Sequence, residues 1–199
     1  MALAPSAGAA THTQRHGKHH RHHKHKHRSV KQAHDRLAGG CPNADTPATN
    51  ASLVAMRAAV VCLINQQRNA HGLPGLKASQ RLNRSAQTWN QAMVGSGNFT
   101  HGTNFAGRIS AVGYTWQTAG ENIATGFPTP HSVVNAWMAS PDHCRNILDP
   151  AFRDVGTGET PQTVGGWATL PATWTQDFGL LMSRNAPSRN SGPQNGCPY

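Results

Sequence analysis

The residues best suited to chemistry are two histidines and a glutamate that lie far apart in the chain. His101 closes the stretch "NFTH", Glu121 lies in "TAGENIATG", and His143 lies in "SPDHC". Imidazole and carboxylate groups can hold a divalent ion such as zinc, and they can also move protons as general acids or bases. The three residues are 20 and 22 positions apart, so no helix or strand periodicity joins them. Only the tertiary structure could bring them together.

A cluster of hydrogen-bonded polar groups that braces loops is the alternative interpretation of these residues. Two other histidines have simpler interpretations: His71 precedes a helix-ending glycine, where a cation is favourable, and His131 lies in the first turn of a predicted helix. The chain contains no H-E-x-x-H, no G-x-S-x-G and no phosphate-binding loop, so the common hydrolase and nucleotide-binding signatures are absent.

The four cysteines favour an exported protein with disulfides. Their spacing fits neither C-x-x-C nor a zinc finger, and an even number indicates two bridges. Three pairings are possible, and we favour Cys41–Cys62 and Cys144–Cys197. The first would tie the N-terminal arm to a helix, and the second would tie the C-terminal tail to a loop. Cysteine nucleophile chemistry is not expected if all four are paired.

Residues 1–40 differ from the rest of the chain in composition. They hold eight Lys and Arg residues, one acid, and nine of the 13 histidines, and they contain little that could build a core. We expect this segment to be a disordered tail that binds anionic polymers by charge and transition metals through its imidazoles. Charge alone does not indicate a specific nucleic-acid partner.

The segments that flank the domain have compositions that also allow predictions. Residues 1–11 resemble the end of a signal peptide, without its charged and apolar regions, and no apolar run approaches the length of a membrane span. Residues 41–51 read as a connector. Residues 185–199 read as a tail anchored by Cys197.

The remaining pattern predicts helices first and strands later. Ser52 caps a helix that ends at Gly72, Ser79 caps a second one, and short helices follow near 105–112, after Thr129-Pro130 and after Ser140-Pro141. We expect residues 120–126 to be irregular, and we expect strands at 153–159, 165–170 and 173–181. The fold class is therefore α+β, with helices packed on a small, mostly antiparallel sheet.

Five motifs occur in the order seen in the CAP superfamily of cysteine-rich secretory, antigen 5 and pathogenesis-related proteins: "CLINQQRNAHGLPGL", "NFTH", "AGENIATG", "VVNAWMASPDHCRNIL" and "TWTQDFG". The chain resembles the short bacterial, SCP-like branch of this superfamily from about Leu53 to Leu181, which places a CAP domain at residues 52–184. The resemblance implies a three-layer α-β-α sandwich. It also implies a cleft with a tetrad of histidines and acids, which holds zinc or another divalent ion in some members.

The resemblance assigns roles to particular residues. His101, Glu121 and His143 match members of the tetrad, and Asn122, Trp174 and Gln176 are further cleft residues. Animal and plant members have a second acid where this chain has Ser140 and a second histidine at Thr173-Trp174, so at most three metal ligands are implied. Bacterial relatives have arginine where this chain has Cys144, which favours a bridge to Cys197.

Two functions follow as expectations. The first is a secreted, non-catalytic protein that binds a small apolar molecule or a cell-envelope polymer in the His/Glu-lined cleft and needs no cofactor. Family members that bind lipids and sterols, and aromatic residues such as Phe99, Phe105 and Trp174, favour it; core packing is the alternative for these rings and is expected for Trp137. The second is a metal-assisted hydrolase, in which His101, Glu121 and His143 hold a divalent ion or Glu121 acts as a general base.

Overall fold

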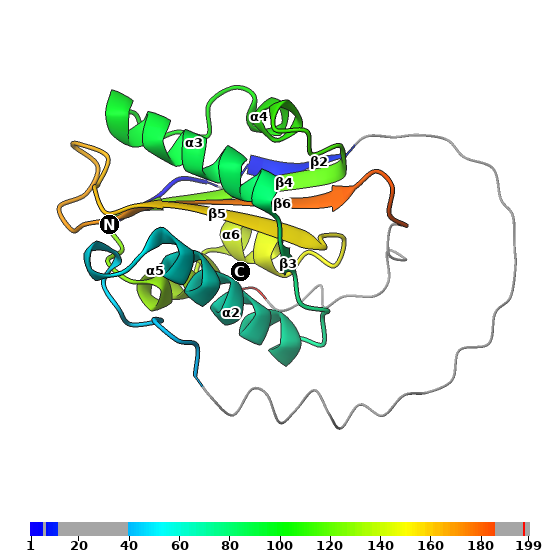
Figure 1. Cartoon of the computed structure of the whole chain (residues 1–199), viewed down its shortest axis with the longest axis horizontal. Helices are drawn as coiled ribbons and strands as arrows, with labels where there is room; N and C mark the ends of the chain where they lie inside the picture. Colours follow the sequence, from blue (N-terminus) through cyan, green and yellow to red (C-terminus); the bar gives the residue numbers. More distant parts are fainter. Residues whose placement is uncertain (6, 12–39, 186–196, 198–199) are drawn as a thin grey trace, which may run out of the picture.

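The protein is a three-layer α-β-α sandwich, described here from a computed structural model. The structure describes residues 1–5, 7–11, 40–185 and 197. One mixed sheet forms the central layer, and helices cover both of its faces (Figure 1). Among these residues, no helix has the length and apolar character that crossing a membrane requires. The predicted fold class is confirmed.

The sheet is built around three long antiparallel strands, β4, β6 and β5. Short strands complete its edges: β3 pairs parallel to β5, while β1 and β2 pair antiparallel to the outer edge of β4. The strands are β1 (Ala2–Leu3), β2 (Ala7–Thr11), β3 (Lys77–Ala78), β4 (Trp116–Thr125), β5 (Asp154–Thr160) and β6 (Thr173–Leu181).

Helices α3 and α4 cover one face of the sheet, and α2, α5 and α6 cover the other (Figure 1). The helices are α2 (Leu53–Ala70), α3 (Gln80–Ser96), α4 (Phe105–Ala111), α5 (Pro130–Met138) and α6 (Pro141–Ile147), with a 3₁₀ turn η1 (Ala48–Asn50) before them. Ser52 and Ser79 accept hydrogen bonds from backbone amides in the first turns of α2 and α3. These caps confirm the predicted helix starts, because each serine satisfies an amide that has no partner within its helix.

The larger hydrophobic core lies between the sheet and the α2, α5 and α6 layer. Trp137 and Trp174 are fully buried in it, as predicted for Trp137. On the other face α3 lies very close to β5. A Cβ atom on Gly156 would sit 2.1 Å from the carbonyl carbon of Leu82, so only glycine permits this approach.

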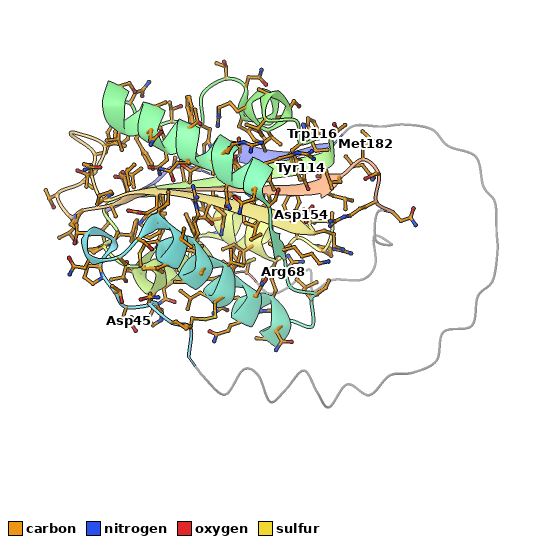
Figure 2. The ribbon with its side chains drawn as sticks, in the orientation of Figure 1. Asp45, Arg68, Tyr114, Trp116, Asp154 and Met182 are labelled. Atoms are coloured by element: carbon orange, nitrogen blue, oxygen red, sulfur yellow. A yellow bond between two sulfur atoms is a disulfide. The ribbon has the colours of Figure 1, made fainter. Side chains whose placement is uncertain are left out.

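Three covalent and polar ties hold the α2 side together. Disulfides join Cys41 to Cys62 and Cys144 to Cys197, which confirms the favoured pairing. Arg68 on α2 is fully buried (Figure 2). It donates hydrogen bonds to four backbone carbonyls, in the loop after α2, at the end of α6 and in the loop after α6: Pro74, Ile147, Asp149 and Phe152.

Two local predictions are wrong. The sequence predicts irregular structure at residues 120–126, but most of them belong to β4, whose neighbours β2 and β6 supply backbone partners on both edges. It predicts a strand at residues 165–170, but they form turns and loop between β5 and β6. Glycine content misleads the first prediction, and Trp167 and Thr169 mislead the second, because strand formation depends on the neighbouring strand more than on local propensity.

The disorder expected for residues 1–40 is wrong at its beginning. Residues 2–3 and 7–11 pair with β4 as strands β1 and β2. These residues are small and uncharged, and an unpaired strand edge offers them a row of backbone donors and acceptors. The His-, Lys- and Arg-rich part of the tail, residues 12–39, lies outside the described residues, as does most of the tail after residue 185.

Candidate functional site

Glu121 is the centre of a buried charged cluster on β4. Its side chain is fully buried, and each carboxylate oxygen has a cationic or imidazole partner. His101 Nδ1 lies 2.7 Å from Oε1, and Arg108 Nη2 donates to Oε2 at 2.5 Å. A buried carboxylate requires such partners, because an isolated charge in the interior is strongly unfavourable. The predicted neighbours His101 and Glu121 therefore do meet.

Arg108 on α4 organises this cluster. Its guanidinium donates to the backbone carbonyl of His101 at 2.8 Å and lies 3.9 Å from the centre of the Trp89 ring. The same group therefore holds the loop that carries His101, the carboxylate of Glu121 and the α3 helix. Planar, multi-donor geometry of this kind is specific to arginine.

Asp177 on β6 lies directly opposite Glu121 in the strand register. Directly paired residues of antiparallel strands project from the same face, so two buried acids lie side by side. Burial raises the pKa of Asp177 well above its usual value, and the charge of Glu121 raises it further. The nearby Ser85 hydroxyl lowers the pKa of Asp177 to a smaller extent. Neither carboxylate oxygen of Asp177 makes a hydrogen bond of normal geometry. Burial and the charge of Glu121 therefore both favour the neutral form of Asp177.

His143 approaches the edge of β4 from α6, on the opposite face of the sheet. Its Nδ1 lies 2.7 Å from Ser140 Oγ, so this serine contacts the ring. Burial, with a smaller contribution from the nearby His101, lowers the pKa of His143 to about 4. The ring is therefore neutral at pH 7. Its Nε2 faces the backbone of Ala4 without a hydrogen bond of normal geometry.

Two residues of the N-terminal segment lie next to His101 and His143, which approach β4 from opposite faces of the sheet. His101 Nε2 contacts the carbonyl oxygen of Pro5, and the adjacent residue Ala4 faces His143. His101 thus has an oxygen atom within hydrogen-bonding distance of each ring nitrogen. We call the outer edge of β4 together with His101, Glu121 and His143 the β4 edge site. The N-terminal segment fills the place where the sequence predicted an open cleft.

The other predicted cleft residues lie on the α6 side of the sheet. Asn122 donates to the carbonyl of His143 at 3.2 Å and to Gln176 Oε1 at 3.3 Å, and Asn146 donates to Asn122 Oδ1 at 2.9 Å. This network fixes α6, and with it His143, against β4. Trp174 does not line the β4 edge site: it belongs to the larger core and donates to the carbonyl of Phe127 at 2.7 Å.

A divalent ion does not fit the cluster as it is arranged. His101 contacts Oε1 of Glu121, and the Arg108 guanidinium contacts Oε2. A positive charge therefore already lies where a cation would bind. Within the described part of the chain, no group of three His, Cys, Asp or Glu side chains could hold a metal ion. The zinc site remains a prediction from the resemblance.

Sequence reasoning missed Arg108, Asp177 and Asn146. Asp177 had a visible signal, because it is an acid inside the apolar strand "TWTQDFGLL". Arg108 and Asn146 had no comparable signal, since a short helix with one arginine or asparagine is ordinary. Their roles depend on the packing of α4 and α6 against β4.

The fold and the buried histidine–glutamate pair together define a CAP-type domain. Residues 61–178 match the sequence model of the CAP family, the cysteine-rich secretory protein family, and the chain therefore belongs to this family. YkwD of Bacillus subtilis strain 168 is similar, with 35% identity over 137 residues that cover 67% of this chain and 50% of YkwD. The chain thus spans about half the length of this relative.

Solved structures show the same fold. An extracellular protein with an SCP domain from Bacillus anthracis has a TM-score of 0.55 and 24% identity, with coverage of 65% of this chain and 44% of that one. An outer surface protein of Borrelia burgdorferi has a TM-score of 0.53 and 22% identity, with coverage of 60% and 87%. At these identities the likeness supports the fold alone.

Proposed function

We propose that this chain is a secreted, non-catalytic CAP protein that binds a small apolar molecule or a cell-envelope component at the β4 edge site. The observation that carries the proposal is the state of Glu121, whose two oxygens are both engaged by His101 and Arg108. A carboxylate held in this way is a poor general base, because accepting a proton would break a buried ion pair. The site is therefore better suited to binding a ligand than to catalysing a reaction.

The groups that a ligand would contact in place of the N-terminal segment are mostly apolar. Met93, Phe99, Ile123 and Val164 form a small hydrophobic cluster beside the β4 edge, and the side chains of Ala2 and Ala4 pack against it. A site of this kind, apolar with a few fixed polar groups, is typical of small-molecule binding. Among the described residues all four cysteines are paired, so no thiol is available as a nucleophile.

Secretion is supported by two observations. Both disulfides are compatible with an oxidising compartment, and they are uncommon in cytosolic proteins. Two of the structural neighbours are described as an extracellular and an outer surface protein. Detection of the protein in culture medium, with both disulfides oxidised, is the direct measurement.

Binding is tested with the purified full-length chain. Native mass spectrometry of the freshly purified protein is expected to show a retained ligand, and lipids or cell-wall fragments are expected to raise the melting temperature. Phe99→Ala should weaken this shift, whereas Phe105→Ala, which truncates the same ring in a different cluster, should not. Absence of both a retained ligand and any thermal shift would reject the proposal.

A metal-assisted hydrolase is the second candidate, and no contact in the described residues favours it. Metal analysis of the full chain would also detect ions bound by the histidine-rich tail. The informative quantity is therefore the difference in bound metal between the parent and a His101→Ala/His143→Ala variant, which share the same tail. A loss of one ion per chain in that variant would favour this candidate over the first.

The binding of anionic polymers by residues 12–39 also remains a prediction. It concerns charge in a segment outside the described residues and does not bear on the β4 edge site.

A further inference from the structure

We infer that the β4 edge site binds an extended, uncharged polypeptide, and that residues 1–5 and 7–11 of this chain are its intramolecular occupant. This inference rests on the proposed function, because it concerns the same site, and it narrows the ligand to a peptide strand. The contacts of the N-terminal segment show how such a strand is held.

Backbone pairing is the first contact. Ala2 and Leu3 pair with Thr125 and Ala124, and farther along the same edge β2 pairs antiparallel with residues 118–121 of β4. Without residues 1–11, the outer edge of β4 would have no partner strand among the described residues. An unpaired edge is a template for another strand, and many domains bind extended peptides in this way.

The two histidines supply the second contact. The occupant departs from regular pairing between β1 and β2, and there His101 Nε2 contacts the carbonyl of Pro5 while His143 faces the backbone of Ala4. Proline has no amide hydrogen, so it cannot continue the ladder and suits this break. Asn146 Nδ2 lies 3.5 Å from the carbonyl oxygen of Ala7, just beyond the break. These side chains recognise backbone groups and would hold any strand of suitable shape.

The size of the occupant's side chains is the third observation. Ala2 and Ala4 pack against the Met93, Phe99, Ile123 and Val164 cluster, while Leu3 packs against the larger core. This alternation places small residues on one face and a larger apolar residue on the other. Gly126 adds to the fit, because a Cβ atom there would lie 3.0 Å from Met1 Cα.

The same contacts explain how an external peptide would gain access. A segment tethered to the domain has a high effective concentration at the site, so a free peptide of similar affinity competes poorly with it. Weakening the intramolecular strand should therefore open the site without removing any group that forms it. A charge placed against the apolar cluster provides that weakening, because burying an unpaired carboxylate is unfavourable.

The experiment uses full-length protein with Ala4→Asp, and Gly8→Asp as the matched control. Both substitutions add one carboxylate to the same segment, but Gly8 is exposed and a Cβ atom there would have no neighbour within 4 Å. The probe is a fluorescein-labelled synthetic peptide with the sequence of residues 1–11. We expect the Ala4→Asp protein to bind it at least tenfold more tightly than the parent or the Gly8→Asp protein. A peptide carrying Ala4→Asp itself should not bind.

Circular dichroism and thermal unfolding establish whether each variant is folded. A folded Ala4→Asp protein that binds the peptide no better than the parent would overturn the inference. If Ala4→Asp does not fold, Ala2→Asp gives a second way to release the strand. Failure of both to fold would show that residues 1–11 are an integral strand of the domain and would also overturn it.

The same proteins separate this inference from the proposed function. Lipid vesicles and cell-wall fragments are added to the folded release variant in parallel with the peptide. Binding of those ligands without binding of the peptide would leave the proposed function standing and reject the peptide site. If the peptide binds, and neither the vesicles nor the cell-wall fragments displace it, the result would support a peptide as the ligand class.

Discussion

Arg68 and Glu121 are both fully buried charges, but their surroundings differ in kind. Arg68 lies on α2 (Figure 2) and donates to backbone carbonyls in the loop after α2, at the end of α6 and in the loop that follows α6. Glu121 lies on β4 and receives hydrogen bonds from two side chains, those of His101 and Arg108. Burial lowers the pKa of Arg68 to about 10, so its charge persists at neutral pH.

The difference separates a structural charge from a charge at a binding site. Carbonyl oxygens are present whatever residue occupies a position, so Arg68 fixes the path of the loops. The partners of Glu121 are side chains that also reach other groups: His101 contacts the N-terminal strand, and Arg108 contacts Trp89. Changes at Arg68 should therefore alter stability alone, and changes near Glu121 should alter stability less and binding more.

The largest effect is expected for Arg68→Met. The substitution leaves several buried carbonyls without donors, which should lower the free energy of unfolding by about 3–5 kcal/mol. Urea unfolding measures this loss. Arg84→Met on the exposed side of α3 is the matched control and should cost less than about 0.5 kcal/mol. A loss below about 1 kcal/mol at Arg68 would remove the distinction between the two charges.

His143 should make stability depend on pH. Its pKa is about 4 in the folded protein against 6.5 as the reference value, so the unfolded state binds more protons between these values. The free energy of unfolding should therefore fall as the pH drops from 6.5 to 4, by about 3 kcal/mol from this group.

His143→Gln removes this titration and serves as the reference. Carboxyl groups with raised pKa values, such as Glu159, act in the opposite direction, so the quantity to compare is the difference between the parent and this variant at each pH. A parallel pH dependence of the two proteins would contradict the neutral, buried state assigned to His143.

Glu121→Gln and Asp177→Asn should have unequal effects although the two residues lie opposite each other. Glu121 carries the charge that holds His101 and Arg108, so its loss should cost about 1–3 kcal/mol. Burial and the charge of Glu121 favour the neutral form of Asp177, so its replacement by the neutral amide should cost less than about 1 kcal/mol. Chemical unfolding at pH 7 measures both values. Equal losses would mean that the two carboxyl groups share the charge.

The smallest effect is expected for Trp89→Leu, which removes the ring beneath Arg108. Trp116→Leu is matched, because both indoles donate one hydrogen bond and only Trp89 contacts the guanidinium. The Trp89 variant should be less stable than the Trp116 variant by about 0.5–1 kcal/mol, the usual strength of a cation–π contact. Thermal unfolding resolves this difference. If the two variants are equally stable, Arg108 contributes through its hydrogen bonds and not through its contact with Trp89.

The sequence predicted the parts of the fold that depend on local chemistry. Ser52 and Ser79 begin helices because their hydroxyls cap nearby amides, and Thr129-Pro130 begins a third. It failed for residues 120–126, where a strand forms because of partners on both edges. It also failed for residues 1–11, whose alanine-rich composition gives no sign of the edge they pair with.

What the sequence by itself determined is the set of motifs that identify the family, the helix boundaries and the choice of His101, Glu121 and His143. Each of these can be read within a few neighbouring residues or within an ordered pattern of motifs. Tertiary structure alone decided that Asp177 lies beside Glu121, that Arg108 completes the ion pair and that the N-terminal segment occupies the β4 edge. These contacts join residues as far apart in the sequence as Ala2 and Thr125. They depend on strand register and helix packing, and no local spacing in the chain encodes either one.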